Sequence, residues 1–302
     1  MGRIADLALL AAGRVAGVAP CVDLPEGSMV ELPGRGRTYL VDTGPVGSSG
    51  GRNRPTLILL HALACTGLLT WYPAICALRQ RYRVVAFDQR WHGQGILSDR
   101  FSLDDCADDT AAVADLLGID RFVAVGYSMG SLVAQLVWHR HPRRLAGAVL
   151  CASTTRFVNS AREPVALRAI GIRTQLAANR QLSPSRPATA WSPGVGANQW
   201  VLGQFRSTTQ RRIAAAGAVI SQFDSSSWIA GMAVPTAVVV TAKDRLIPPH
   251  RQRLLARQIP EATIYELDAG HASCVLRADR FTPAVQAACA SVSARAVAHG
   301  RQ

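Results

Sequence analysis

The sequence is poor in lysine and lacks any paired cysteine motif. Lys243 is the one lysine among 33 basic residues, a bias that fits the codon usage of a GC-rich genome better than a functional choice. Although the net charge is +13, the arginines form no cluster typical of nucleic-acid binding, so we expect no DNA or RNA partner. Seven cysteines without a C-x-x-C pair favour a reducing, cytoplasmic environment and argue against a zinc site.

A long membrane-spanning run is also missing. Residues 4–19 are apolar, but Asp6 and Arg14 interrupt them, and the apolar positions recur at helical spacing. We therefore expect an amphipathic helix in an N-terminal extension, residues 1–28, packed on the rest of the protein. Contact with a membrane surface is the less favoured alternative. Residues 55–78 contain no charged side chain, but they are typical of a buried strand, a loop and a helix with Thr70 as its N-cap, so we expect no transmembrane span.

The sequence does contain a regular alternation of predicted strands and helices. Because 49% of the 302 residues are hydrophobic, the chain can bury a large core. This βαβ alternation predicts an α/β fold with a doubly wound, mostly parallel sheet, whose active site lies at the carboxyl ends of the strands. Strands are expected at 29–32, 37–42, 56–60, 83–87, 122–125, 145–151, 235–241 and 263–267, and helices near 71–79, 103–117 (with Ser102 as N-cap), 132–138 and 249–258 and from about 283.

The alternation is interrupted over residues 155–222. Helical patches are expected there near 164–179 and 199–220, around a segment rich in proline and serine at 183–193, and no strand pattern appears. The region holds nine arginines and one acid, Glu163. We interpret it as a helical cap inserted into one α/β core that comprises residues 29–154 and 223–302.

The motif Gly126-Tyr127-Ser128-Met129-Gly130 lies between a predicted buried strand and a predicted helix. A sharp turn from strand to helix forces the central residue into strained backbone geometry and leaves no room for side chains at the two glycines. The serine hydroxyl is thereby exposed above the sheet, and the Met129 amide lies at a helix N-terminus that favours negative charge. This context is the nucleophile elbow of serine hydrolases, although an ordinary glycine-rich turn remains the alternative.

Two further residues follow predicted strands in the order that such chemistry requires. A serine hydroxyl needs a general base, and the base needs an orienting acid. Asp244 comes just after the strand at 235–241, and His271 comes just after the strand at 263–267. We therefore predict Ser128 as nucleophile, His271 as general base and acid, and Asp244 as the group that fixes the imidazole tautomer. The backbone N–H groups of Leu63 and Met129 are predicted to form the oxyanion hole.

Five motifs occur together in this chain: Gly126–Gly130, Leu60-His61-Ala62, Asp88–Gly93, Thr241–Pro248 and Gly270-His271. On these motifs the chain resembles the α/β-hydrolase fold superfamily, in its cap-bearing esterase and lactonase-like branch, over about residues 29–290. The resemblance implies an eight-stranded, mostly parallel sheet, a lid inserted after the sixth strand, and a mechanism without metal or cofactor. Two positions depart from the family pattern: Ala62 replaces the usual glycine after His61, and Trp91 replaces the first glycine of the usual Asp-x-Arg-Gly-His-Gly.

These observations predict a serine hydrolase that cleaves a carboxylic ester, lactone or related acyl compound through an acyl-enzyme. Its partner would be a small-molecule acyl substrate, either apolar or, given the cap arginines, anionic. Acyl transfer, a cofactor-free haloperoxidase-type activity, and ligand binding without turnover are the alternatives. Four aromatic residues are candidates for lining the substrate pocket, although a place in the core is the more common role for such residues: Trp191, Trp200, Phe205 and Trp228.

Overall fold

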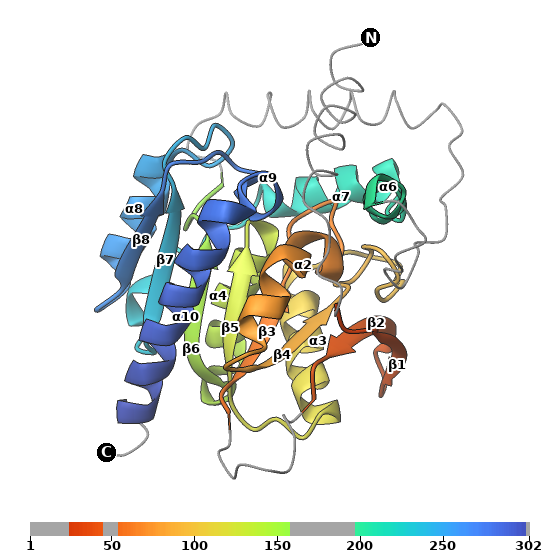
Figure 1. Ribbon diagram of the computed structural model, residues 1–302, viewed down its shortest axis with the longest axis horizontal. Helices are drawn as coiled ribbons and strands as arrows, with labels where there is room; N and C mark the ends of the chain where they lie inside the picture. The colour runs from red at the N-terminus through yellow and green to blue at the C-terminus, as the bar shows by residue number, and fades with distance from the viewer. Residues whose placement is uncertain (1–23, 45–53, 158–196, 300–302) are drawn as a thin grey trace.

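The computed structural model describes residues 24–44, 54–157 and 197–299 (Figure 1). The expected helix within residues 4–19, the helical patch at 164–179 and the side chains of Trp191 and Phe205 lie outside the described residues. The division of the chain into core and cap therefore stays a prediction.

An eight-stranded sheet forms the centre of the molecule, as the sequence predicted. Its order is β1-β2-β4-β3-β5-β6-β7-β8; β2 pairs antiparallel with both β1 and β4, and the other neighbours are parallel. The strands are β1 (Ser28–Leu32), β2 (Gly36–Asp42), β3 (Thr56–Leu60), β4 (Arg83–Phe87), β5 (Phe122–Tyr127), β6 (Leu145–Cys151), β7 (Thr236–Thr241) and β8 (Thr263–Leu267).

Helices cover both faces of this sheet because its central strands are apolar on both sides. In β3, Ile58 and Leu60 pack with α3 (Leu103–Leu116) and α4 (Met129–Arg140), whereas Leu57 and Leu59 pack on the opposite face with α2 (Gly67–Leu78) and α10 (Ala278–His299) (Figure 1). This two-sided burial is typical of parallel strands. The helices are α2 (Gly67–Leu78), α3 (Leu103–Leu116), α4 (Met129–Arg140), α6 (Ala197–Arg206), α7 (Gln210–Ile220), α8 (Pro249–Gln258), α9 (Ser273–Leu276) and α10 (Ala278–His299), with short 3₁₀ turns at Pro142–Arg144 and Ile229–Gly231.

Helix α2 begins earlier than predicted, and its N-cap is Thr66 rather than Thr70. The Thr66 hydroxyl accepts a hydrogen bond from the Leu69 N–H at 2.9 Å. The Thr70 hydroxyl instead accepts one from the Ala62 N–H, at 3.3 Å, and so fixes the loop before the helix. Thr66 and Thr70 are about one helical turn apart and both are suitable N-cap residues, so the local sequence did not show which of them caps the helix. The predicted cap of α3, Ser102, is confirmed by its bond from the Asp105 N–H at 3.3 Å.

Helix α10 also begins earlier, at Ala278 rather than near Pro283. Proline is common in the first turn of a helix, which is why the sequence suggested that start. Here Phe281 lies fully buried between the rings of Trp71 and Tyr127, at centroid distances of 5.8 and 5.3 Å, and this packing extends the helix by one turn. The patch predicted at 199–220 consists of two helices, and Thr209 caps the second by accepting from the Arg212 N–H.

Cysteines in both redox states occur in the described part of the chain, and Cys76 is disulfide-bonded. Five other described cysteines are free thiols: Cys65 is partly buried, and Cys106, Cys151, Cys274 and Cys289 are buried. As for a membrane, none of the helices within 24–44, 54–157 and 197–299 is both long and apolar enough to cross one.

Candidate active site

The turn from β5 to α4 has the strained geometry expected of the elbow. Ser128 lies between the two elements with φ 52° and ψ −114°, a left-handed conformation that is unfavourable for a residue with a side chain. A Cβ atom at Gly126 would collide with the carbonyl of Gly130, and one at Gly130 would collide with the carbonyl of Leu60. Both glycines are therefore required because the backbone of α4 passes directly over β3 and β5.

The structure brings Ser128, His271 and Asp244 together from three separate loops at the carboxyl ends of the strands. His271 Nε2 lies 3.0 Å from Ser128 Oγ, and His271 Nδ1 lies 2.7 Å from Asp244 Oδ2. The other acid near this histidine in sequence, Asp268, instead pairs with Lys243 at 2.8 Å and with Arg280.

The carboxylate of Asp244 is buried but well supplied with hydrogen-bond donors. Its Oδ1 accepts from the N–H groups of Leu246 and Ile247 at 2.8 and 2.9 Å. Its Oδ2 accepts from the Thr241 hydroxyl at 2.8 Å and from the Gln252 amide at 3.3 Å, in addition to His271. Burial by itself raises the pKa of Asp244, but the hydrogen bonds and the facing imidazole outweigh it, so the pKa lies below its usual value.

Thr241 and Gln252 were not identified from the sequence as part of this site. Gln252 is fully buried in α8, where its amide also donates to the Ile247 carbonyl at 2.7 Å and its oxygen accepts from the Thr241 N–H at 3.0 Å. The one sequence signal was a glutamine on the first turns of a predicted helix directly after the Asp244 loop, and this signal is too general to identify such a role.

Tyr127 holds the histidine loop in place through its backbone. The Tyr127 hydroxyl donates to the carbonyl oxygen of His271 at 2.7 Å and lies 2.9 Å from Ser273 Oγ. Burial raises the pKa of this phenol well above its usual value, so it stays protonated and can donate. The variable position before Ser128 in the motif thus links the serine turn to the loop that carries His271.

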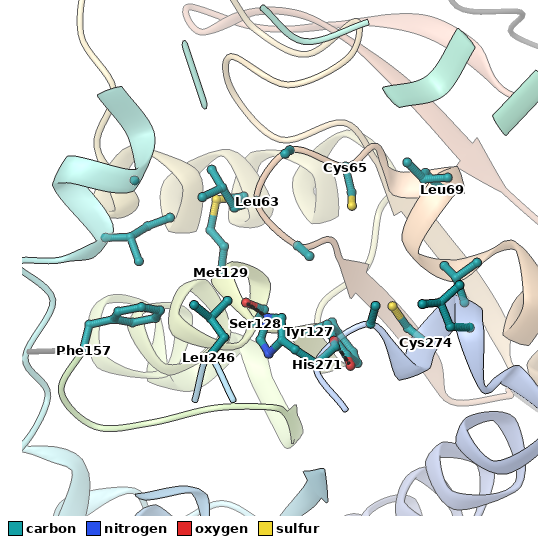
Figure 2. A pocket seen from close by; sticks show the side chains of 17 residues that line it. Leu63, Cys65, Leu69, Tyr127, Ser128, Met129, Phe157, Leu246, His271 and Cys274 are labelled. Carbon is teal, nitrogen blue, oxygen red and sulfur yellow. Dashed lines mark hydrogen bonds between the residues drawn. The ribbon is translucent and has the colours of Figure 1, made fainter. Parts of the chain in front are cut away.

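The two residues predicted to supply oxyanion N–H groups, Leu63 and Met129, both line the same cavity as Ser128 (Figure 2). The loop of Leu63 is fixed by His61, whose Nε2 accepts from the Gln89 N–H at 2.8 Å while its Nδ1 donates to the Ala62 carbonyl at 2.8 Å. Burial holds the pKa of His61 well below its usual value, which keeps this imidazole neutral.

The two departures from the family pattern have local explanations. Ala62 uses its N–H to donate to Thr70, as described above, and its side chain lines the cavity. Trp91 has a positive φ of 67° and packs on Phe101 at a centroid distance of 5.6 Å, while its indole N–H donates to the Ser98 carbonyl at 2.8 Å. Trp91 is therefore not among the described residues that line the cavity.

A cavity of about 310 Å³ opens onto Ser128 and His271. Its walls are mainly aliphatic and aromatic side chains from the loop after β3, from α7, and from the segment around α9 (Figure 2). Of the four aromatic candidates, Trp200 belongs to the core and packs on Tyr72, and Trp228 stacks on His139 at 4.4 Å. Neither of these two lines the cavity.

A buried polar network connects the serine turn to the two chain segments that enter and leave residues 158–222. We call these segments, 155–157 and 223–225, the neck. They pair through the Ser225 N–H, which donates to the Thr155 carbonyl at 2.8 Å, and through an antiparallel bridge between Arg156 and Asp224. Gln135 of α4 binds next to one neck segment and within the other: its amide N–H donates to the carbonyl of Thr154, the residue before the neck, at 3.1 Å, and its oxygen accepts from the Ser225 hydroxyl at 2.7 Å.

The network continues from Gln135 to the serine itself. The Gln135 amide also donates to Ser153 Oγ at 3.1 Å, and Ser131 Oγ lies 2.7 Å from Ser153 Oγ and 2.5 Å from the Ser128 carbonyl oxygen. Gln135, Ser131, Ser153 and Ser225 are all fully buried. Phe157 belongs to the neck, Ile220 lies just before its second segment, and both line the cavity, so the network sets the position of one cavity wall relative to Ser128.

Comparison with known proteins agrees with this architecture. The chain is 26% identical over 247 residues to 3-oxoadipate enol-lactonase 2 of Acinetobacter baylyi, covering 79% of this chain and 90% of that protein. The enol-lactonase structure from Burkholderia xenovorans LB400 superposes with a TM-score of 0.68 at 25% identity, covering 87% of this chain and all of that one. A thermophilic esterase from Thermogutta terrifontis has a TM-score of 0.67 at 22% identity, covering 88% and 99%, and shows the shared fold.

The family model described as the alpha/beta hydrolase fold matches residues 55–278, a range that includes Ser128, Asp244 and His271. The relatives in the comparison are named as enol-lactonases and as putative carbamate hydrolases. The chain therefore belongs to the α/β hydrolase fold family.

Proposed function

We propose that the protein is a serine hydrolase that cleaves a carboxylic ester or lactone through an acyl-enzyme. The observation that carries the proposal is the 3.0 Å distance between His271 Nε2 and Ser128 Oγ at the floor of the cavity. The lactonase relatives support lactones as one substrate class, and the cavity supports a small acyl substrate.

The hydrogen bonds around Asp244 define the proton relay. With its pKa lowered, Asp244 is a carboxylate at neutral pH and can only accept, so His271 carries its proton on Nδ1. A neutral imidazole protonated there has a lone pair on Nε2, which faces the serine hydroxyl. His271 therefore acts as the base that removes the Ser128 proton during attack on the carbonyl carbon.

The remaining steps use the same groups. The oxygen of the tetrahedral intermediate is stabilised by the N–H groups of Leu63 and Met129, the latter at the N-terminus of α4. His271 then gives its proton to the leaving alcohol, and Ser128 keeps the acyl group. A water molecule, deprotonated by His271, attacks the acyl-enzyme and releases the acid and the free serine.

The test is active-site labelling combined with turnover. A fluorophosphonate should modify the wild-type protein at Ser128, as shown by peptide mass spectrometry, and short-chain esters should be hydrolysed. The Ser128→Ala variant should lose both. Retained ester hydrolysis in Ser128→Ala, or labelling at a different residue, would contradict the assignment.

A further inference from the structure

The described residues that line the cavity beside Ser128 offer a ligand few polar contacts other than the reacting groups. Its larger apolar side chains are Leu63, Phe157, Ile220, Leu246, Val275 and Leu276. Among the residues of the described chain that line it, there is no arginine, lysine, aspartate or glutamate. Tyr127 also lines it, and its hydroxyl is already bonded to the His271 carbonyl and Ser273.

The apolar walls lie on both sides of the serine. In Figure 2, Leu63, Phe157 and Leu246 lie to one side of Ser128 and His271, whereas Cys65, Leu69 and Cys274 lie to the other. An ester or lactone carbonyl has one substituent on the acyl side and one on the alkoxy side. A substrate attacked at Ser128 therefore places both substituents against apolar surface.

The cavity is also small. A volume of about 310 Å³ is at the low end for ligand pockets.

Building on the proposed hydrolase function, we propose that the substrate is a small, uncharged ester or lactone with apolar groups on both sides of the reacting carbonyl. A carboxylate on either substituent would lose its hydration and meet no opposite charge on these walls, which is strongly unfavourable. The site then discriminates between substrates by the charge on their substituents. It does not discriminate by whether the reacting group is an ester or a lactone.

Gly217 sets how much room the substrate has on one side. It lies in the interior of α7 and borders the cavity, and a Cβ atom added there would meet one neighbour within 4 Å, Leu63 Cδ2 at 3.8 Å. Glycine is a poor helix former, and its φ here is not one that requires glycine. The absent side chain is therefore explained by the space that it leaves in the cavity.

The charge selection is tested with pairs of esters of equal shape. Butyl 4-methylpentanoate and monobutyl succinate differ in an isopropyl group replaced by a carboxylate on the acyl side. The butanoate esters of 4-methylpentanol and of 4-hydroxybutanoate make the same change on the alcohol side. With release of acid followed in a pH-stat, we expect kcat/KM for each neutral ester to exceed that of its anionic partner by at least about 100-fold. Equal rates, or a preference for the anion, would overturn the proposal.

A matched pair of arginine variants tests whether the cavity wall is the cause. Leu246 borders the cavity and Leu254 lies outside it on α8, and their exposed fractions are nearly the same, 45% and 46%. Leu246→Arg should reduce the preference for neutral esters by about 10-fold or more, because the guanidinium supplies the missing counter-charge. Leu254→Arg should leave the preference as in wild type. The same change in both variants would show that net charge, and not the cavity, governs selection.

The size determinant is tested by comparing Gly217→Leu with Ala218→Leu, its exposed neighbour on the same helix. Gly217→Leu should lower the ratio of kcat/KM for butyl butanoate to that for ethyl acetate by at least about 10-fold, since the new side chain occupies cavity volume. Ala218→Leu should not change the ratio. An unchanged ratio in Gly217→Leu would contradict the role given to this glycine.

A binding measurement separates this proposal from the proposed function. In Ser128→Ala, calorimetry with the same ester pairs should show binding of the neutral member at concentrations where the anionic one does not bind. If the wild-type protein is neither labelled by fluorophosphonate nor active, the hydrolase function fails, and this measurement still decides the charge selection. Tighter binding of the anionic ester would overturn the charge selection whatever the catalytic result.

Discussion

At the scale of single residues, the site depends on the absence of side chains as much as on their presence. Gly126 and Gly130 face backbone carbonyl groups that cannot move away without shifting β3 or α4. Gly118 offers a contrast: it has a positive φ of 61°, but a Cβ atom there would meet nothing within 4 Å.

We therefore expect Gly126→Ala or Gly130→Ala to lower the free energy of unfolding by at least about 2–3 kcal/mol, because the added methyl displaces backbone. Gly118→Ala should cost only about 1 kcal/mol, the price of a left-handed conformation alone. Urea unfolding of the three variants measures this. A loss in Gly126→Ala or Gly130→Ala no larger than in Gly118→Ala would contradict the tight approach of α4 to the sheet.

Asp244 gives a prediction about pH. Its pKa is lowered in the folded protein, so the folded state holds the charged form more strongly than the unfolded state does. The stabilisation is fully present above the ordinary aspartate pKa of about 3.9 and is lost as the pH falls through the lower folded value.

At pH 7 the wild type should exceed Asp244→Asn in free energy of unfolding by about 1–3 kcal/mol, the range for hydrogen bonds to a charged group. The difference should shrink as the pH is lowered below about 4. Denaturant unfolding of both proteins between pH 3 and pH 7 provides the measurement. A difference that grows on acidification would mean that the Asp244 pKa is raised by its burial.

At the scale of the elements, the neck and α4 form one unit. The neck has two kinds of polar contact: the buried Gln135 network, and the ion pair of Arg156 with Asp224, whose side chains are 48% and 40% exposed. Exposed ion pairs contribute little to stability, whereas a buried polar group left without its partner is costly.

Gln135→Leu should therefore lower the free energy of unfolding by about 2–4 kcal/mol, since Ser153 and Ser225 lose a buried partner. Arg156→Ala should cost less than about 1 kcal/mol. Gln135→Leu should also raise KM more than it lowers kcat, because Phe157 and Ile220 shift relative to Ser128 while His271 and Asp244 do not depend on the network. Chemical unfolding and steady-state kinetics test both statements, and similar stability losses in the two variants would refute the contrast.

The elements that sequence predicted best are those with strong local patterns. The bounds of β3, β4, β6, β8 and α8 match the prediction because each is an apolar or amphipathic run between residues that break the pattern. The predicted starts of α2, α4 and α10 were less accurate because they depend on contacts made in the folded chain, such as the burial of Phe281 against Trp71.

The supporting residues of the site were beyond local sequence reasoning for the same reason. Gln135 bonds to Ser225, 90 residues away, and Tyr127 bonds to the carbonyl of His271, 144 residues away. A glutamine or tyrosine carries no local signal of such a partner. Ser128, Asp244 and His271 could be predicted because parallel strands bring their carboxyl ends to one edge, so that chain order alone indicates which loops meet.

At the scale of the whole molecule, the sheet unites residues from positions 128 to 271 into one catalytic relay in the proposed function. When catalytic groups act as a unit, the losses in kcat caused by removing each of them do not add up, because removal of one group disables the others. This property belongs to the assembled fold and not to any single residue.

The most direct test of the account is the kcat of Ser128→Ala, His271→Ala and the double variant on one ester. If the two side chains share one proton transfer, each single variant should lose on the order of 10⁵–10⁶ in kcat, as in other serine hydrolases with such a relay. The double variant should then be no slower than either single one. Losses that multiply in the double variant would show that Ser128 and His271 act independently and would contradict the proposed mechanism.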